Sequence, residues 1–391
     1  MARKLVEVVF ILILVVGGLG RTLANDVKDK ADTAATEQVY SDDDRLRLQP
    51  AHWLWRLYDP NSAKYVFRAT NLQQARIWQD QARAALNEVL GFQDEPKVEP
   101  DPRLLEKVDR GDYIREKVLI RTGAHVEMPV YILLPKKLPR PLPVVIALHG
   151  HGYGAKSIVG IQEDGSERER PEGYQKDFAV ALCRSGFAVA APEISCFGER
   201  RTGIWSANDS SGKRPSNSCR HTAILASHLG GSVLGLRVLD TKRLVDYLQS
   251  RKEMDTCRLG MMGISGGGML TFYTTALDTR IKACVVSGYF CTFKDSVLAI
   301  KHCDCNYVHG MSRFGEMSDI VGLIAPRPML VEAGSEDSIF PIASVKRSVR
   351  SGRKVYEVFG AGDQFETDYF DGGHQISGRR AYDFLMDKLS M

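Results

Sequence analysis

A single serine stands between glycines in the stretch Gly263-Ile264-Ser265-Gly266-Gly267. An apolar run over 259–264 precedes it and another over 269–273 follows, so the pattern predicts a strand, a sharp turn and a helix. In a G-x-S-x-G turn, glycine leaves room on both sides and the serine oxygen stands clear of the backbone. Ser265 is therefore the candidate nucleophile, although a stretch rich in glycine and serine is also typical of an ordinary turn.

A serine hydroxyl needs a base that removes its proton and a third group that orients this base. Downstream of Ser265, Asp337 follows an apolar run and His374 ends a short glycine-rich loop. The order nucleophile, acid, histidine is one of those in which serine triads occur. We predict that Asp337 orients His374, which deprotonates the serine. Glu332 or Glu336 could replace Asp337, and a loop aspartate or histidine is often only a turn or surface residue.

Two candidate donors for a negatively charged oxygen accompany the serine. Acyl transfer develops such an oxygen, which needs fixed N–H groups. We predict the backbone N–H of Gly266, directly after the serine, and that of His151, in the sequence His149-Gly150-His151-Gly152. Two histidines here also suggest a metal site, but no carboxylate or third histidine follows at ligand spacing. We therefore predict no metal, and serine chemistry of this kind requires no cofactor.

These residues need a scaffold that brings distant loops together. The run Leu142–Leu148 is apolar throughout, as in a central parallel strand covered on both faces. A predicted hairpin, 113–121 and 126–134, precedes it. Strands and helices then alternate: the predicted strands are 187–191, 259–264, 281–286, 328–332 and 354–359, and the helices are 178–183, 233–248 and 380–389. This indicates an α/β fold with a mostly parallel central sheet, helices on both faces and ligands at the carboxyl ends of the strands.

The N-terminal part of the chain differs from the rest. Arg3 and Lys4 precede nine apolar residues over 8–16, so residues 1–24 are predicted to be a signal peptide or a membrane anchor. Nine residues are short for a membrane span, which favours cleavage and a secreted or periplasmic protein over a retained envelope anchor. We interpret 25–43 as a flexible lead-in, 44–100 as an N-terminal helical extension packed on the main domain, and 101–391 as the catalytic domain.

The composition excludes some classes of partner. The chain has 391 residues, 44% of them hydrophobic and 26% charged, enough for a large core. Its formal net charge is only +4, and no basic stripe is interleaved with aromatic residues. Nucleic acid is therefore not an expected partner, and membrane association is expected only through the N-terminal segment.

The eight cysteines fall into two groups. Cys183, Cys257 and Cys284 lie in or beside apolar runs, where a thiol is usually a small core residue. The others lie in or near predicted loops, where a disulfide is one interpretation for an exported protein: Cys196, Cys219, Cys291, Cys303 and Cys305. Cys303 and Cys305, beside His302, also suggest a zinc site. Because a fourth ligand is missing, a pocket wall or a thiol pair is favoured.

Five stretches carry a resemblance to a known family: LHGHG at 148–152, APEISCFGERR at 191–201, GISGGG at 263–268, EAGSEDSIFPI at 332–342 and GGH at 372–374. From about residue 110 to the C-terminus the chain resembles the α/β-hydrolase superfamily, and within it the bacterial dienelactone-hydrolase-like and acetyl-xylan-esterase-like serine esterases. The resemblance implies the α/β-hydrolase fold. It also implies the roles of nucleophile, acid and base for Ser265, Asp337 and His374.

The resulting hypothesis is a serine hydrolase that cleaves carboxylic esters through an acyl-enzyme. The resemblance implies a small acyl group, such as acetyl on a carbohydrate, and so a small-molecule or carbohydrate ester as the partner. Two alternatives remain open: a serine peptidase or amidase of the same fold, and a catalytically inactive hydrolase-fold protein that binds a partner at the cell envelope. The sequence does not indicate the substrate-binding residues or the oligomeric state.

Overall fold

The computed structural model describes residues 41–202 and 217–390. The predicted signal or anchor segment and most of the predicted lead-in lie outside the described residues. The chain divides into two compact units, Met1–Asp59 and Pro60–Met391. In the first unit, the helices α2 (Asp42–Arg47) and α3 (Pro50–Leu57) are described. The second unit contains helix α4 (Leu72–Leu90) and the whole sheet with its covering helices.

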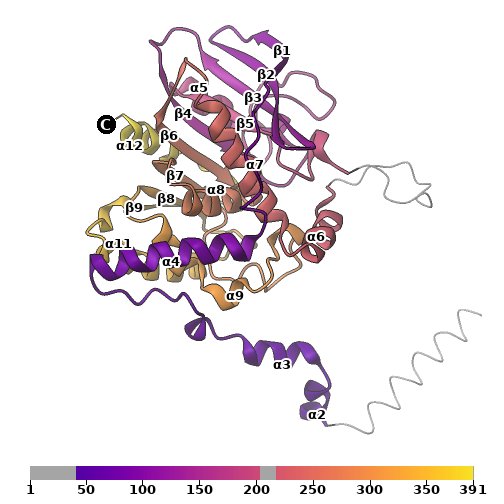
Figure 1. The fold of residues 1–391 in the computed structure, drawn as a ribbon, viewed down its shortest axis with the longest axis vertical. Coiled ribbons are helices and arrows are strands. Elements are labelled where there is room, and N and C mark those ends of the chain that lie inside the picture. Colours follow the sequence, from indigo (N-terminus) through magenta and orange to yellow (C-terminus); the bar gives the residue numbers. More distant parts are fainter. Residues whose placement is uncertain (1–40, 203–216, 391) are drawn as a thin grey trace, which may run out of the picture. The chain divides into compact units, whose positions relative to one another are not determined.

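A nine-stranded sheet is the framework of the second unit (Figure 1). Its strand order is β1-β2-β3-β5-β4-β6-β7-β8-β9. The strands are Arg103–Asp109 (β1), Tyr113–Gly123 (β2), Val126–Pro135 (β3), Leu142–Leu148 (β4), Ala188–Pro192 (β5), Met254–Ile264 (β6), Ala283–Ser287 (β7), Met329–Gly334 (β8) and Phe365–Phe370 (β9). The pairs β1–β2, β2–β3 and β3–β5 are antiparallel, and all other pairs are parallel. The predicted mostly parallel sheet and its leading hairpin are confirmed.

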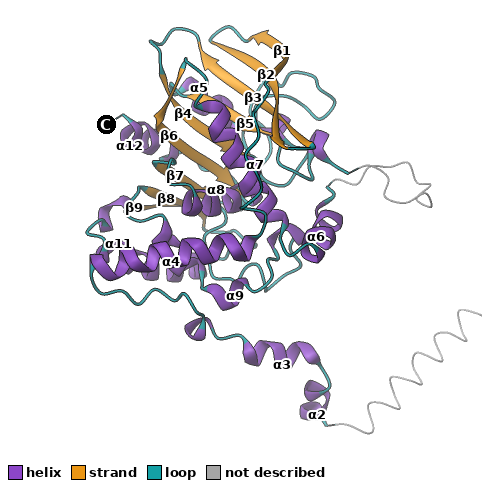
Figure 2. Cartoon of the chain, viewed as in Figure 1, coloured by secondary structure: helices purple, strands orange, loops and turns teal. Residues whose placement is uncertain are grey.

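Helices cover both faces of the sheet (Figure 2), as the alternation in the sequence predicts. The apolar run of β4 supplies both cores, because successive side chains point to opposite faces: Val144 and Ile146 enter one core and Val145 and Ala147 the other. The first core also contains residues of α4, α7 (Val233–Leu248), α8 (Gly266–Leu277) and α11 (Ile342–Val358). The second contains residues of α5 (Phe178–Arg184) and α12 (Ala381–Leu389).

One predicted strand is wrong. Residues 354–359 form the last turns of α11 and the residue that follows it, not a strand. This helix buries Val345, Val349, Gly352 and Tyr356, which recur every three or four residues as on one face of a helix, and it also buries Val355. The short β-favouring sequence around Val355 therefore yields to the longer helical pattern. The strand beside β8 is instead β9, which the sequence analysis did not predict.

The edge strand β1 was not predicted either. Its residues are almost all exposed, so it lacks the apolar alternation that marks a half-buried strand. Among the described residues, no single helix is both long and apolar enough to cross a membrane. Helices α6 (Cys219–His228) and α7 meet that test only as a pair, bent by 95°.

Candidate active site

Ser265 lies at the sharp turn between β6 and α8, so the predicted strand, turn and helix are confirmed. Its backbone has φ 57° and ψ −120°, a strained conformation for a residue other than glycine. The flanking glycines are required by close packing. A Cβ on Gly263 would lie 2.3 Å from the carbonyl oxygen of Gly267, and one on Gly267 would lie 1.9 Å from that of Leu148. The serine is thus held where β6, β4 and α8 meet.

The side chains of His374 and Asp337 form a close pair. His374, in the loop after β9, has its Nδ1 2.7 Å from Oδ2 of Asp337, in the loop after β8. The other carboxylate oxygen, Oδ1, accepts the backbone N–H groups of Ile339 at 2.8 Å and Phe340 at 3.0 Å. The ring of His374 is stacked between those of Tyr174 and Phe340. These contacts fix both the position and the orientation of the imidazole.

The acid in contact with the histidine is Asp337 and neither of the two alternatives. Burial opposes the charge of Asp337, but the bond from His374 and the two backbone N–H groups outweigh this, so its pKa lies below the usual value. Glu332 is buried, which raises its pKa, and it bonds the hydroxyl of Ser287 at 2.7 Å and the N–H of Gly378 at 2.9 Å. Glu336 is exposed. The structure therefore pairs only Asp337 with the imidazole.

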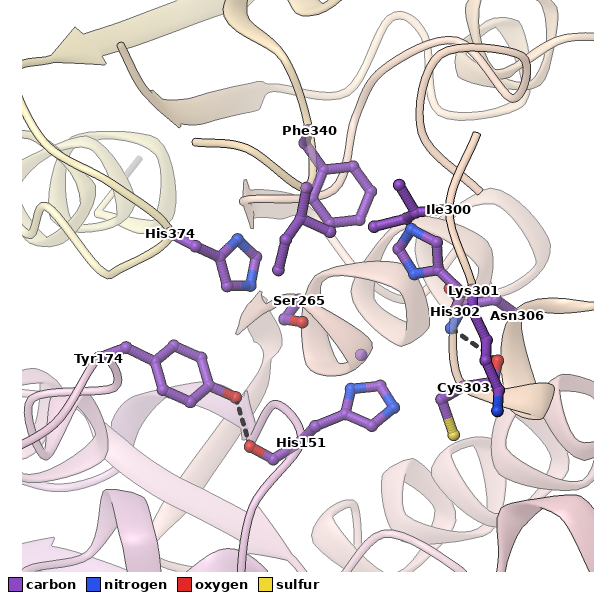
Figure 3. Close-up of a pocket in the computed structure, with 12 residues that line it drawn as sticks. His151, Tyr174, Ser265, Ile300, Lys301, His302, Cys303, Asn306, Phe340 and His374 are labelled. Atoms are coloured by element: carbon purple, nitrogen blue, oxygen red, sulfur yellow. Dashed lines mark hydrogen bonds between the residues drawn. The ribbon is translucent and has the colours of Figure 1, made fainter. Parts of the chain in front are cut away.

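Ser265, Gly266, His151 and His374 all line one pocket of about 320 Å³ (Figure 3). Nε2 of His374 is buried and has no hydrogen-bond partner among the described residues, so it does not bond the hydroxyl of Ser265 in this structure. Such bonds are often long or absent before a substrate binds. Four of the five residues singled out from the sequence thus line one pocket, and the fifth, Asp337, contacts His374; the serine and the histidine are not bonded to each other.

The loop that contains His151 is fixed by hydrogen bonds. The hydroxyl of Tyr174 donates to the carbonyl of His151 at 2.6 Å, and Oε1 of Gln175 accepts the N–H of Gly150 at 2.7 Å. Within residues 41–202 and 217–390, neither the backbone N–H of His151 nor that of Gly266 donates to a backbone carbonyl. Gly266 is also the first residue of α8, where the helix dipole favours negative charge. Both predicted donors are therefore available.

The opposite wall of the pocket comes from the segment after β7, which includes Ile300–Cys303 and Asn306. The sequence analysis favoured a pocket wall or a thiol pair for Cys303 and Cys305, and Cys303 does line the pocket. Cys305, just behind it, has its Sγ 3.5 Å from Nε2 of His151. Burial opposes a charge on His151, but bonds with the thiols of Cys303 and Cys305 raise the pKa of its ring to about 9.

The cysteines match the sequence interpretation in part. All eight are free thiols in this structure, so no disulfide is formed. Cys183 and Cys284 are buried in the core, as expected. Cys257 is exposed, so its assignment to the core is wrong. It lies in the first half of β6, where side chains are only partly covered.

Comparison with known proteins gives the family. The profile of the Abhydrolase family, Abhydrolase_7, matches residues 56–381. The chain belongs to this family. The abhydrolase is also 31% identical over 276 residues to YtaP of Bacillus subtilis (strain 168), whose name assigns it provisionally as a hydrolase. The match covers 68% of this chain and 84% of YtaP. The resemblance to the α/β-hydrolase superfamily is confirmed.

Solved structures share the fold of the abhydrolase at low sequence identity. A Bacteroides fragilis protein, provisionally assigned as an acetyl xylan esterase, aligns with a TM-score of 0.68 and 18% identity, over 83% of this chain and 82% of its own. A glucuronoyl esterase from Solibacter usitatus aligns with a TM-score of 0.61 and 15% identity, over 84% and 97%. The protein therefore has the fold of α/β-hydrolase esterases.

Sequence reasoning missed several residues at the site of this abhydrolase. Tyr174 and Phe340 enclose the imidazole, and Gly288, at φ 51°, makes room for it: a Cβ there would lie 2.9 Å from Cε1 of His374. Tyr174 carries no local signal, since nothing nearby in the chain marks it as a neighbour of His374. Gly288 directly follows β7, and a glycine at a strand end is a signal that was available.

Proposed function

We propose that this abhydrolase is a serine esterase that hydrolyses carboxylic esters through an acyl-enzyme. The observation that carries the proposal is the strained turn that exposes Ser265 to the pocket lined by His374, whose Nδ1 contacts buried Asp337. Ser265 is the nucleophile, His374 the base and Asp337 the group that orients it.

Protons and charge balance in each half of the reaction. Because Nδ1 of His374 faces Asp337, Nε2 is the nitrogen free to accept the proton of Ser265 as its Oγ attacks the ester carbon. The oxyanion accepts hydrogen bonds from the N–H groups of Gly266 and His151. The C–O bond to the alcohol then breaks, and Nε2 returns the proton to the leaving oxygen. Water repeats the sequence, which releases the acid and restores the serine.

The proposed substrate is a small-acyl ester of a carbohydrate, such as an acetylated sugar. Two observations support it. The pocket volume of about 320 Å³ is at the lower end for small-molecule sites, and its outer wall carries the polar side chains of Lys301, His302 and Asn306. Proteins named as acetyl xylan, glucuronoyl and methyl esterases share the fold. Acetate is then the expected acid product, and a sugar hydroxyl the leaving group.

The test is hydrolysis of a panel: acetylated xylan, sugar acetates, a glucuronoyl methyl ester, short and long nitrophenyl esters, and nitroanilides. We expect acetate release that Ser265→Ala abolishes. Cleavage of nitrophenyl esters without acetate release from any sugar would reject the substrate but not the mechanism. Faster cleavage of nitroanilides than of the matched esters would favour a peptidase or amidase.

Labelling by a fluorophosphonate separates the enzyme from an inactive binding protein of the same fold. Such a probe reacts only with an activated serine, so we expect one labelled site, which Ser265→Ala removes and which denaturation abolishes. Absence of label on the folded wild-type protein would refute a serine mechanism altogether.

We also propose that residues 1–24 direct export, since their basic start and apolar core have the order of a signal peptide. This segment lies outside the described residues. Determining the N-terminus of the mature protein after expression tests the proposal: cleavage near residue 24 is expected, and an intact N-terminus in the membrane fraction would indicate an anchor.

A further inference from the structure

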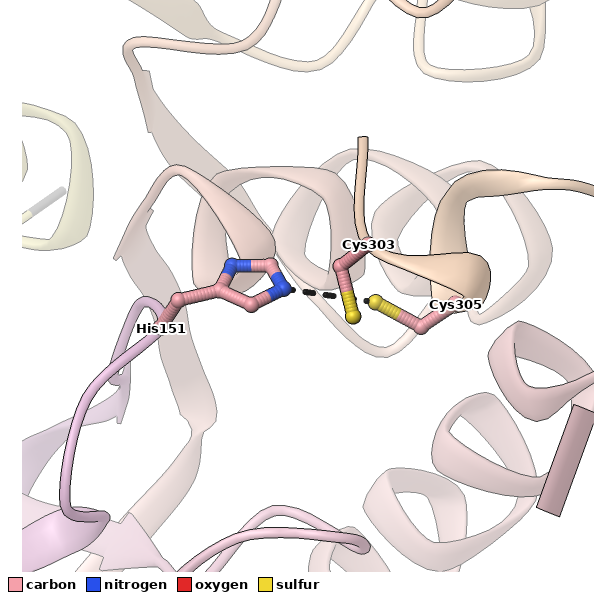
Figure 4. A group of neighbouring side chains, drawn as sticks. All are labelled: His151, Cys303 and Cys305. Atoms are coloured by element: carbon pink, nitrogen blue, oxygen red, sulfur yellow. Dashed lines mark hydrogen bonds between the residues drawn. The ribbon is translucent and has the colours of Figure 1, made fainter. Parts of the chain in front are cut away.

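A cluster of sulfur and nitrogen atoms lies beside the pocket and has no part in the proposed ester hydrolysis. The side chains of His151, Cys303 and Cys305 each offer one ligand atom, and these atoms all lie within 4.8 Å of one another. Figure 4 shows the sulfur of Cys305 pointing toward Nε2 of His151, with the sulfur of Cys303 beside it, although the three residues come from two separate segments. His302, the histidine next to Cys303 in the sequence, is not part of the group.

The spacing within the cluster matches tetrahedral zinc. Zinc binds histidine nitrogen at about 2.0–2.1 Å and thiolate sulfur at about 2.3 Å, so a tetrahedral angle places the two ligand atoms about 3.5 Å apart. The distance from Nε2 of His151 to Sγ of Cys305 is 3.5 Å. The same distance is also that of a thiol–imidazole hydrogen bond, so the composition of the cluster, and not this spacing alone, carries the inference.

Cys219 is the candidate for a fourth ligand, although it lies outside the group of three. Cys219, the first residue of α6, is fully buried, and its thiol interacts with those of Cys196, Cys303 and Cys305. Two thiols of the cluster therefore have a third thiol as neighbour. With Cys219 the set has three sulfurs and one nitrogen, a combination typical of structural zinc.

Charge balance supports the same set. Arg237 is only 1% exposed, and its guanidinium contacts Sγ of Cys219 at 3.2 Å and the carbonyl of Ser195 at 3.0 Å. Within the described part of the chain, no carboxylate forms an ion pair with it, and its Nε has no hydrogen-bond partner. A buried cation needs a compensating negative charge. A zinc ion with three thiolates and a neutral imidazole carries one net negative charge, which Arg237 neutralises.

We propose that His151, Cys219, Cys303 and Cys305 bind one zinc ion, with Arg237 as the outer hydrogen-bond donor to Cys219. Cys303 and His151 line the pocket, so the ion has a path from solvent. The ion joins three segments that are distant in the sequence: the loop of His151, the start of α6 and the segment after β7. It therefore stabilises the pocket wall, and it stands apart from the serine chemistry because Ser265 is not a ligand.

The test measures metal directly in the purified full-length protein. After incubation with Zn²⁺ and removal of the unbound ion, we expect about one zinc per chain. Replacement by Co²⁺ should give the intense near-ultraviolet absorption of thiolate-to-cobalt charge transfer and the visible bands of a tetrahedral site. Cys219→Ser, Cys303→Ser and Cys305→Ser should each weaken binding by about 100-fold or more, beyond the usual effect of an outer-shell partner.

Matched controls define the site. Two cysteine variants should retain one zinc per chain. Cys257→Ser changes an exposed cysteine, and Cys196→Ser changes a cysteine that lies beside Cys219 but is not in the group with His151. Ser265→Ala should also retain the ion, which separates a failure of this proposal from a failure of the esterase proposal. If a ligand variant does not fold, thermal unfolding of the wild-type protein tests the proposal instead. Zn²⁺ should raise the thermal midpoint of the wild-type protein, and a chelator should lower it.

Three results would overturn the proposal. In the first, the folded wild-type protein binds no stoichiometric zinc and its thermal midpoint does not shift. In the second, the protein as isolated contains a disulfide that includes Cys219, Cys303 or Cys305. In the third, any of the three serine variants retains zinc in full. The first result excludes the site, the second replaces it with a covalent pair, and the third removes that cysteine from the ligand set.

Discussion

The space beside Gly288 allows a sharp test of the proposed base. At φ 51° this glycine occupies the left-handed region, and a Cβ would lie 2.9 Å from Cε1 of His374, whereas ordinary contacts begin at 3.4 Å. In Gly288→Ala, the imidazole must therefore move by about 0.5 Å. Since a misplacement of about 1 Å at a reacting group can cost roughly 100-fold in rate, we expect kcat to fall about tenfold, with KM nearly unchanged.

The matched control is Gly360→Ala. Gly360 also has a positive φ, 69°, but a Cβ there would meet nothing within 4 Å among the described residues, and it follows α11 away from the pocket. Both variants should lose about 1–2 kcal/mol of unfolding free energy from backbone strain, and Gly288→Ala about 1–3 kcal/mol more from crowding. Nitrophenyl acetate kinetics and urea unfolding measure both quantities. If kcat of Gly288→Ala stays within about twofold of the control, the position of His374 does not limit the reaction.

Further predictions concern the partners of the imidazole and of the oxyanion loop. Asp337→Asn should lower kcat by about 10³–10⁴-fold, while Glu332→Gln should change it by less than about threefold, as steady-state kinetics will show. Because the pKa of Asp337 is lowered in the folded state, its stabilisation is present above about pH 4 and lost as the pH falls through the folded pKa. Urea unfolding of Asp337→Asn should therefore depend less on pH below about 4 than that of the wild type; an equal dependence would contradict the assigned contacts. Tyr174→Phe removes the bond to the carbonyl of His151 and keeps the ring against His374, so we expect kcat to fall about tenfold, about 1–2 kcal/mol in transition-state stabilisation. Unchanged kcat in that variant would mean that the loop is held by other contacts.

The sequence was sufficient for the parts of the site that follow from the sheet. Apolar runs mark β6 and β8, which end shortly before Ser265 and Asp337, so the convergence of these two residues at one edge is a consequence of topology. His374 follows β9, which has no apolar run, and the sequence marked this residue only by its glycine-rich loop and its place in the chain order. Contacts between side chains of different loops produce no comparable pattern in the sequence. The clearance at Gly288 and the stacking of Tyr174 on His374 depend on loop paths that no periodic pattern encodes.

The same reason explains why the sequence argued against a metal. Cys303 and Cys305 suggest a ligand pair, but ligand spacing along the chain offers only His302 as a neighbour and no fourth group. The fold instead brings His151 and Cys219 from other segments to the same two thiols. His151 then serves two proposals with different atoms, its backbone N–H for the oxyanion and Nε2 for the ion. Since a substitution at a cysteine leaves that N–H in place, and one at Ser265 leaves the ligands in place, each proposal can fail while the other stands.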